Sequence, residues 1–308
     1  MENKLRISNI IFNKKNINRL NQILLSGYRL KSSNTEYVDE YTAIVMDKGK
    51  RKHNEDAALS ITHPENKEFR LVAVADGMGG HFIGDRFSYK TLKYLSDWFN
   101  SLPEYYYYRT DLLYPALRMK IMEISEEFSL DLNDGGNTLV LGIICEYEVL
   151  CVNLGDSRLY GYDTRSGDLQ LVTEDESVVW NSNDPLELDK HRFHKNSSRI
   201  TNCLYSGGNV NIDQMYTFDR GAFDRLVLCT DGVSDMMSFD EMNDLLDESE
   251  TNLDMAKSLV RKATTEDSFS EINYGPDYAY RLPAGKDNAT CLVTTITNHK
   301  VKEKVKIF

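Results

Sequence analysis

The sequence predicts an α+β fold, in which antiparallel β-sheets are covered by α-helices. Short apolar runs broken by turn residues predict strands, and apolar stripes at helical spacing predict helices that come in pairs between groups of strands. The strict alternation of strand and helix that builds a parallel, doubly wound sheet is absent. With 308 residues the chain can bury a large core, and we expect one main domain.

Strands are predicted from residue 42 onward, where β-favouring apolar runs alternate with turn residues. The predicted strands are residues 43–46, 71–75, 139–144, 150–154, 159–162, 225–229 and 290–295. These runs should dominate the core, because they are the most apolar parts of the chain.

Helices are predicted between the strands. Ser238 with Glu241, and Thr251 with Asp254, have the spacing of a helix N-cap and its partner, so a helix should follow each pair. Two earlier helices are indicated by apolar stripes. The first stripe is Leu92, Leu95 and Phe99, and the second is Leu113, Leu117, Ile121, Ile124 and Phe128.

The two ends of the chain differ from the main domain, which we place at residues 41–298. Residues 1–40 form a basic extension, and residues 299–308 form a basic tail. Ile17, Leu20 and Leu24 have helical spacing and predict a short amphipathic helix. This helix either packs on the main domain or serves in docking, for example at a membrane surface. The basic residues of the extension include Lys4, Arg6, Lys14, Lys15 and Arg19.

Two polar stretches with little periodicity interrupt the main domain. They are residues 176–214 and residues 266–285. Loops of this length in compact domains are often functional, so we expect surface excursions, the second of which carries a specific partner contact.

Charge and cysteine content limit the possible functions. The chain has 48 Asp and Glu against 36 Lys and Arg, which argues against nucleic acid as a partner. Five cysteines without close CxxC spacing indicate buried free thiols and a reducing compartment. The N-terminus lacks the apolar run of a secretory signal, and no stretch is long enough to span a membrane. We therefore expect a cytoplasmic protein, and a monomer.

The most informative pattern is an apolar strand that runs directly into an aspartate beside a glycine. It occurs at Asp76-Gly77, at Asp231-Gly232 and at Gly155-Asp156. A buried strand holds its last residue rigidly, and glycine lets the chain turn away with its carbonyl exposed. One such dipeptide is explained by an ordinary turn, but the repetition favours metal ligands.

Two further sites extend the carboxylate set. Glu55 and Asp56 follow the first strand, and Asp287 precedes the last, with Asn288 expected to support the ligands beside it. Oxygen ligands without cysteine and with few histidines select Mg2+ or Mn2+. Two such ions can lower the pKa of a water held between them, so that hydroxide attacks phosphorus directly. Arg51 is the candidate fork for the substrate phosphate, although it could also be an ordinary surface arginine.

These motifs resemble those of the metal-dependent protein phosphatase family, the type 2C serine/threonine phosphatases, and in particular its bacterial-type members. The resemblance runs from about Thr42 to Thr295, which makes residues 41–298 the expected phosphatase catalytic domain. The matching motifs are Arg51 with Asn54-Glu55-Asp56, then Asp76-Gly77-Met78-Gly79-Gly80-His81, Gly155-Asp156-Ser157-Arg158, Thr230-Asp231-Gly232 and Asp287-Asn288.

The resemblance implies a fold, an activity and partners. The fold is a sandwich of two antiparallel sheets flanked by paired helices, in four layers α/β/β/α. The activity is hydrolysis of phosphoserine and phosphothreonine with two or three Mn2+ or Mg2+ ions. The partners are phosphorylated proteins, the substrates of an opposing Ser/Thr kinase.

The resemblance also implies ligand roles. Asp76 bridges both ions, and the carbonyl of Gly77 holds one of them. Asp231 and Asp287 bind the other ion, and Asp156 matches a ligand of a third, looser ion. The remaining ligands, acting directly or through water, are Glu55 and Asp56.

Departures from the family pattern affect loops and the general acid. Asn137 stands in Gly136-Asn137-Thr138 where a threonine is usual, a change that we expect to be structural. Glu176 replaces a histidine in Thr173-Glu174-Asp175-Glu176-Ser177, and residues 266–285 form a longer insertion than expected. Some family members have a histidine directly after the Asp-Gly pair, which acts as the general acid for the departing oxygen. Here that position is Met78, so the general acid is either His81 or a water on a metal ion.

Two other functions remain open from the residues. A pseudophosphatase or regulatory binding module would keep the fold, but its usual mark is the loss of metal aspartates, and here all are present. A nuclease or a small-molecule phosphoesterase would use similar ions, but it fits neither the acidic balance nor the motifs.

Overall fold

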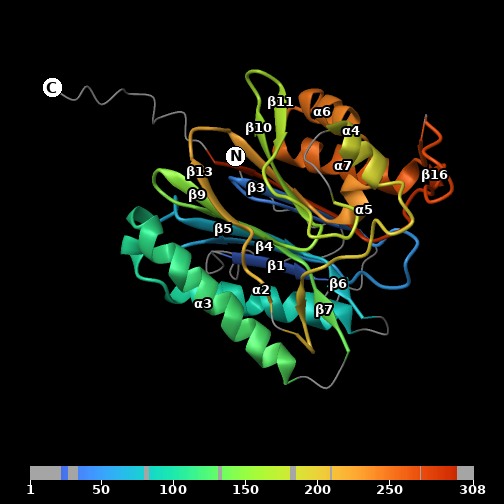
Figure 1. The fold of residues 1–308 in the computed structure, drawn as a ribbon. Helices are drawn as coiled ribbons and strands as arrows, with labels where there is room; N and C mark the ends of the chain where they lie inside the picture. Colours follow the sequence, from blue (N-terminus) through green and yellow to red (C-terminus); the bar gives the residue numbers. More distant parts are fainter. Residues whose placement is uncertain are drawn as a thin grey trace.

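Two six-stranded antiparallel sheets pack face to face, and helices cover both outer faces (Figure 1). This is the arrangement in the computed structural model, which describes residues 22–26, 34–79, 83–130, 134–180, 185–208, 210–270 and 272–296. The four-layer sandwich confirms the predicted fold class.

The first sheet has the strand order β1-β4-β5-β8-β9-β13. Helices α2 (Gly84–Ser101) and α3 (Thr110–Ser129) cover its outer face, with the 3-10 helix η1 (Glu104–Tyr108) between them (Figure 1). The strands are β1 (Gln22–Ser26), β4 (Ala57–Thr62), β5 (Arg70–Ala75), β8 (Leu139–Ile144), β9 (Glu148–Leu154) and β13 (Met215–Asp219).

The second sheet has the strand order β11-β10-β14-β17-β3-β2. Its outer face is covered by α5 (Asp231–Ser234), α6 (Phe239–Asp247) and α7 (Asn252–Thr265), and α4 (Pro185–His191) contacts α6. The strands are β2 (Asn34–Val38), β3 (Thr42–Asp47), β10 (Arg158–Asp163), β11 (Asp168–Leu171), β14 (Arg225–Cys229) and β17 (Ala289–Thr295).

Two small sheets complete the described part of the chain. One joins β12 (Leu204–Tyr205), β7 (Gly136–Asn137) and β6 (Gly77–Met78), and the other pairs β15 (Ser268–Phe269) with β16 (Arg281–Leu282). The first of them carries Gly77 beyond the end of β5, so it belongs to the candidate site.

The core lies in three layers, which explains why the central strands are continuously apolar. In β5, Leu71, Ala73 and Ala75 face the helices of the first sheet, whereas Val72 and Val74 face the second sheet. A strand that is buried on both faces needs apolar residues at every position. All seven predicted runs are strands in the structure.

The predicted helices are also present. Ser238 accepts a hydrogen bond from the backbone N–H of Glu241 at 3.1 Å, and the Glu241 carboxylate accepts one from the backbone N–H of Ser238 at 2.7 Å. Thr251 caps α7 by accepting from the backbone N–H of Asp254 at 3.1 Å. These contacts confirm both predicted N-caps.

The extension at residues 1–40 contributes to both sheets, which its sequence did not indicate. Strand β1 pairs with β4, and β2 pairs with β3. Leu24 lies in β1, so the helix predicted through Leu24 is wrong there. Pairing with strands distant in sequence determines these two edge strands, and no local pattern reveals it. Ile17, Leu20 and the tail at residues 299–308 lie outside the described residues.

The cysteine prediction is confirmed for the buried thiols. Cys145, Cys151, Cys229 and Cys291 are buried and free, and Cys203 is free and partly exposed. Within the described ranges, none of the helices combines the length and apolar character needed to cross a membrane.

Candidate metal centre

Four aspartates lie at strand boundaries that meet at one end of the sandwich. β4 and β5 are antiparallel neighbours with Ala57 opposite Ala75, which places Asp56, just before β4, beside Asp76, just after β5. β14 and β17 are likewise antiparallel neighbours, so the residues after β14 lie beside those before β17. Asp231 and Asp287 occupy these positions. We call Asp56, Asp76, Asp231 and Asp287 the carboxylate centre.

Asp56 joins the two sheets through a buried carboxylate. Its Oδ2 accepts hydrogen bonds from the hydroxyls of Thr290 at 2.6 Å and Thr230 at 3.1 Å, which belong to the second sheet. Its Oδ1 is buried and has no partner within the described residues. Burial raises the pKa of Asp56 to about 8, and the charges of Asp287 and Asp231 add to the effect.

The pKa values of Asp76 and Asp231 are both raised. Loss of solvent raises the pKa of Asp76 well above its usual value, and the charges of Asp56 and Asp231 raise it further. Loss of solvent, with Asp235 and Asp287, raises the pKa of Asp231 to about 7. Its Oδ1 is buried and has no partner among the described residues. Two orphaned carboxylate oxygens in a crowd of like charges are the chemistry of a cation site.

Arg51, the candidate for the phosphate clamp, lies beside Asp287 of the carboxylate centre. Its Nη2 donates to Oδ2 of Asp287 at 2.5 Å, and its Nε donates to the carbonyl of Lys286 at 3.1 Å. Burial lowers the pKa of Arg51, but the charges of Asp287, Asp231 and Asp76 outweigh it and raise the pKa overall. The side chain remains 52% exposed, so it is accessible to a ligand.

Asp235 and Lys286 form an ion pair beside the centre that sequence reasoning missed. Lys286 Nζ donates to Oδ2 of Asp235 at 3.0 Å. The charges of Asp235 and Asp231 raise the pKa of Lys286 against the opposing effect of burial, which is the largest single cause. A signal was present in the sequence, because Asp235 follows Asp231 by one helical turn and Lys286 precedes Asp287.

Asn288 fixes the loop that carries Arg51 and Glu55. Its Oδ1 accepts from the backbone N–H of Glu55 at 2.8 Å, and its Nδ2 donates to the carbonyls of Lys48 at 2.9 Å and His53 at 2.8 Å. Desolvation, followed by the charge of Asp85, raises the pKa of Glu55. The Asn288 side chain thus holds the loop of Arg51 and Glu55 against the segment that carries Asp287.

Gly77 sits where no side chain fits. A Cβ there would lie 2.3 Å from the carbonyl oxygen of Gly84 and 2.5 Å from that of Glu55. Asn137 lies opposite Gly77 in the β6–β7 pair, and its Oδ1 accepts from the hydroxyl of Thr91 at 2.8 Å. The departure at Asn137 is therefore structural, as predicted.

Asp156 is connected to the carboxylate centre and to the loop that follows. Burial raises its pKa well above the usual value, and the charges of Asp231 and Asp175 contribute. Asp175 forms a buried ion pair with Arg158 at 2.8 Å. Asp156 therefore lies within electrostatic reach of Asp231.

Glu176, which replaces the family's histidine, grips the same turn. Its carboxylate accepts from the backbone N–H of Gly155 at 3.1 Å and from Nδ2 of Asn202 at 2.7 Å. Gly155 has a φ of +108°, which favours glycine, so the turn before Asp156 is held by backbone conformation and by Glu176 together. Glu176 thus makes its contacts within this loop, between the turn at Gly155 and Asn202.

The donor set fits a hard divalent cation. All its side-chain donors are carboxylate oxygens, and two of these oxygens are buried without partners. Across the described residues, no three Asp, Glu, His or Cys side chains converge closely enough to form a ready ligand group. His81 lies outside the described residues, and Met78, in β6, is partly buried.

Comparisons with known proteins agree with this geometry. The protein phosphatase 2C family matches residues 48–267, a region that includes Arg51 and Asp231 and ends before Asp287. The serine/threonine phosphatase stp of Listeria monocytogenes is 31% identical over 256 residues, which cover 80% of this chain and 92% of that protein. The serine/threonine protein phosphatase PstP of Mycobacterium tuberculosis is 29% identical over 193 residues, covering 61% of this chain and 35% of PstP.

Solved structures share the fold. The serine/threonine phosphatase Stp1 from Staphylococcus aureus superposes with a TM-score of 0.66 at 24% identity, covering 83% of this chain and 95% of Stp1. PppA, a regulatory component of T6SS in Pseudomonas aeruginosa, superposes with a TM-score of 0.59 at 27% identity, covering 84% of this chain and 98% of PppA.

Proposed function

The chain belongs to the protein phosphatase 2C family, and we propose that it hydrolyses phosphoserine and phosphothreonine in other proteins with the help of manganese or magnesium ions. It is a protein serine/threonine phosphatase, as its relatives are named. The observation that carries the metal dependence is the pair of orphaned, buried oxygens of Asp56 and Asp231 among mutually repelling carboxylates.

We assign the ion ligands to the carboxylate centre and its neighbours. Asp76, Asp231, Asp287 and the carbonyl of Gly77 would hold two ions. Asp156 would serve a third ion. The remaining ligands, direct or through water, would be Glu55 and Asp56. When bound, the ions would lower the pKa of a water molecule and offset the charge of the phosphate.

Arg51 would bind the phosphate of the substrate. Its guanidinium uses Nε and Nη2 within the protein, and Nη1 has no partner among the described residues. The positive guanidinium of Arg51 would orient the phosphate and hold it against the repulsion of the neighbouring carboxylates.

Water would attack phosphorus directly, without a covalent phosphoenzyme. The thiol nearest the centre in sequence is Cys229, and burial raises its pKa to about 12, so it stays protonated and is a poor nucleophile. The proton for the departing serine or threonine oxygen would come from His81 or from water.

The cellular setting follows from the same proposal. The substrates would be phosphorylated proteins in the cytoplasm, modified by a Ser/Thr kinase, and the enzyme would act as a monomer. A pseudophosphatase is less favoured, because every aspartate of the family motifs is present in this chain.

A metal-dependent activity assay tests the proposal. Phosphothreonine peptides and para-nitrophenyl phosphate should be hydrolysed with Mn2+ or Mg2+, and chelation should abolish turnover. Asp231→Asn, which keeps the shape of the side chain and removes its charge, serves as the control. Turnover that survives chelation would contradict the metal dependence, and a folded but inactive wild type would favour the pseudophosphatase.

A further inference from the structure

The two polar excursions of the chain pack together as one unit beside the carboxylate centre. The backbone N–H of Lys195 donates to the carbonyl of Asp277 at 2.8 Å, and that of Ala279 donates to the carbonyl of Phe193 at 2.7 Å. His194 and Tyr278 form an antiparallel bridge between these bonds. We call residues 177–180, 185–200 and 274–280 the side lobe.

The side lobe carries a cavity of about 540 Å³ that is open to solvent and is lined mainly by basic and aromatic residues. Its one acidic residue among the described residues is Glu187, which pairs with Lys190 at 3.3 Å. The basic and aromatic residues that line the cavity are Trp180, Lys190, His191, His194, Arg199 and Tyr278. The balance of charge in this cavity is therefore positive.

Several hydrogen-bond donors in the cavity are available for a ligand. The exposed guanidinium of Arg199 makes no ion pair with the described residues. His194 accepts the backbone N–H of Asn196 on Nδ1 at 3.0 Å, which leaves Nε2 as the donor of the neutral ring. His191 is only 7% exposed and its Nε2 lies 3.7 Å from the Glu187 carboxylate, so its ring contributes to the wall of the cavity and is not one of these donors.

The cavity adjoins the catalytic end of the sandwich. The Trp180 ring, in its wall, lies 5.8 Å from the guanidinium of Arg158 and 6.0 Å from the His191 ring. Arg192 of the side lobe donates from Nη1 to the carbonyl of Asp235 at 3.4 Å, and Asp235 ends the short helix α5 that begins at Asp231. The side lobe therefore touches the helix whose first residue, Asp231, belongs to the carboxylate centre.

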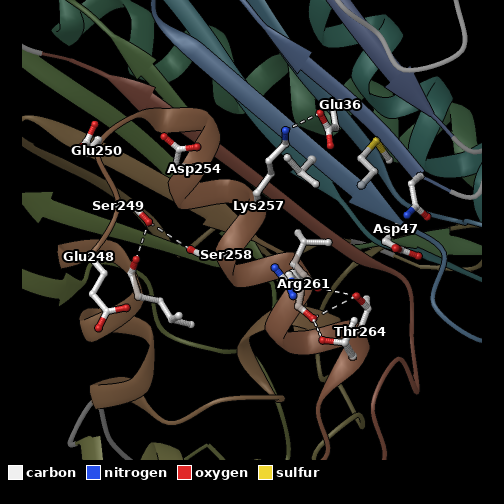
Figure 2. A pocket seen from close by; sticks show the side chains of 16 residues that line it. Glu36, Asp47, Glu248, Ser249, Glu250, Asp254, Lys257, Ser258, Arg261 and Thr264 are labelled. Carbon is white, nitrogen blue, oxygen red and sulfur yellow. Dashed lines mark hydrogen bonds and ion pairs between the residues drawn. The ribbon is translucent and has the colours of Figure 1, made fainter.

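A second cavity of this protein shows the opposite character. It has a volume of about 730 Å³ and lies between α7, the edge strand β2 and its neighbour β3 (Figure 2). Lys257 in its wall is already paired with Glu36 at 2.9 Å. The acidic residues that line it are Glu36, Asp47, Glu248, Glu250 and Asp254. An anion is repelled there, so this cavity provides a matched control.

We propose that the cavity of the side lobe binds a second anionic side chain of the substrate, a phosphate or a carboxylate, while the phosphoserine or phosphothreonine lies at the carboxylate centre. This inference rests on the proposed function. It makes the enzyme selective for multiply phosphorylated or acidic segments of proteins. Arg199 supplies the full positive charge, and Nε2 of His194 supplies a further donor.

Peptide kinetics test the inference. We would use a phosphothreonine peptide series in which one phosphoserine, or one glutamate in a parallel series, moves through the flanking positions. For the wild type, kcat/KM should rise about tenfold at a restricted set of positions, mainly through KM. Arg199→Ala should remove this gain, Arg199→Lys should restore part of it, and turnover of para-nitrophenyl phosphate should stay within about twofold, since this substrate is too small to reach the side lobe.

The matched control is Arg261→Ala in the acidic cavity, which should keep the gain. A wild type without position-dependent gain, or Arg199→Ala with the gain intact, would overturn the inference. A wild type that hydrolyses no phosphopeptide at all would instead overturn the proposed function. The glutamate series separates a general anion site from one that requires phosphate.

Discussion

The carboxylate centre and the side lobe adjoin each other, but the protein builds them differently. The centre consists of residues placed at the ends of buried strands, and Asp56 reaches across to hydroxyls of the other sheet. The side lobe is held by a few bonds between two loops, such as the one from Lys195 to Asp277. Rigid strands thus place the groups for the chemistry, and loops add contacts that can vary without disturbing them.

The largest effect should come from removing one charge at the centre. Asp231→Asn should lower kcat/KM by about a thousandfold or more, because an ion ligand is lost. Its melting temperature should not fall, since repulsion from Asp287 and Asp235 is relieved. Steady-state kinetics with Mn2+ and thermal unfolding in chelator measure the two effects. Activity close to wild type would remove Asp231 from the ligand set.

The next largest effect concerns pH and stability in the presence of a chelator. The pKa values of Asp56 and Asp231 are raised to about 8 and about 7, above unfolded values near 4. The folded protein therefore holds protons that the unfolded chain has released. This contribution to stability is present below about pH 4 and is lost as pH rises through about 7 to 8.

Urea unfolding in chelator between about pH 5 and about pH 8 checks this expectation. The free energy of unfolding should fall with rising pH by up to about 1.4 kcal/mol per pH unit for each such proton. Mn2+ should flatten the profile, because ions replace the protons. A flat profile in chelator would mean that these carboxylates do not crowd one another.

Arg51 should show a smaller effect, confined to substrate binding. Arg51→Ala should raise KM for para-nitrophenyl phosphate by about tenfold with a smaller change in kcat, since it removes a cation that contacts the phosphate. Arg51→Lys keeps the positive charge but loses the two-pronged guanidinium, so its KM should lie between those of the wild type and Arg51→Ala. Unchanged kinetic parameters would exclude the phosphate role.

The smallest effect should come from the side lobe. Asp277→Ala removes an exposed ion pair with Lys195, and exposed pairs contribute little to stability. The melting temperature and the turnover of para-nitrophenyl phosphate should stay close to those of the wild type. A large loss of turnover would show that the side lobe and the carboxylate centre are not independent.

The difference between strand ends and loops also explains which features could be predicted from the sequence. Asp76 and Asp231 were predictable, because each follows a buried apolar run directly and local sequence determines both features. The fold class followed from the same runs. Strands β1 and β2 were missed, since pairing with distant strands determines them. The ion pair of Asp235 with Lys286 was also missed, although each partner lies beside a predicted ligand, because pairing between the two motifs appears only in the folded chain.

The joining of the two excursions could not be predicted either. The bridge between His194 and Tyr278 connects segments that show no shared pattern in the sequence. Each excursion was expected to be functional on its length alone, and only the structure brings the two together. The charge of the cavity they form depends on this contact, so no motif could have indicated it.

Thermal unfolding at about pH 8 with chelator and with Mn2+ tests most directly whether the buried aspartates need a divalent cation. If ion occupancy is nearly complete, the wild type should melt several degrees higher in Mn2+, roughly 5 to 10 °C. Asp231→Asn should melt at or above the wild type in chelator and gain much less from Mn2+. A wild type that does not respond to Mn2+, or a variant that responds equally, would contradict the account.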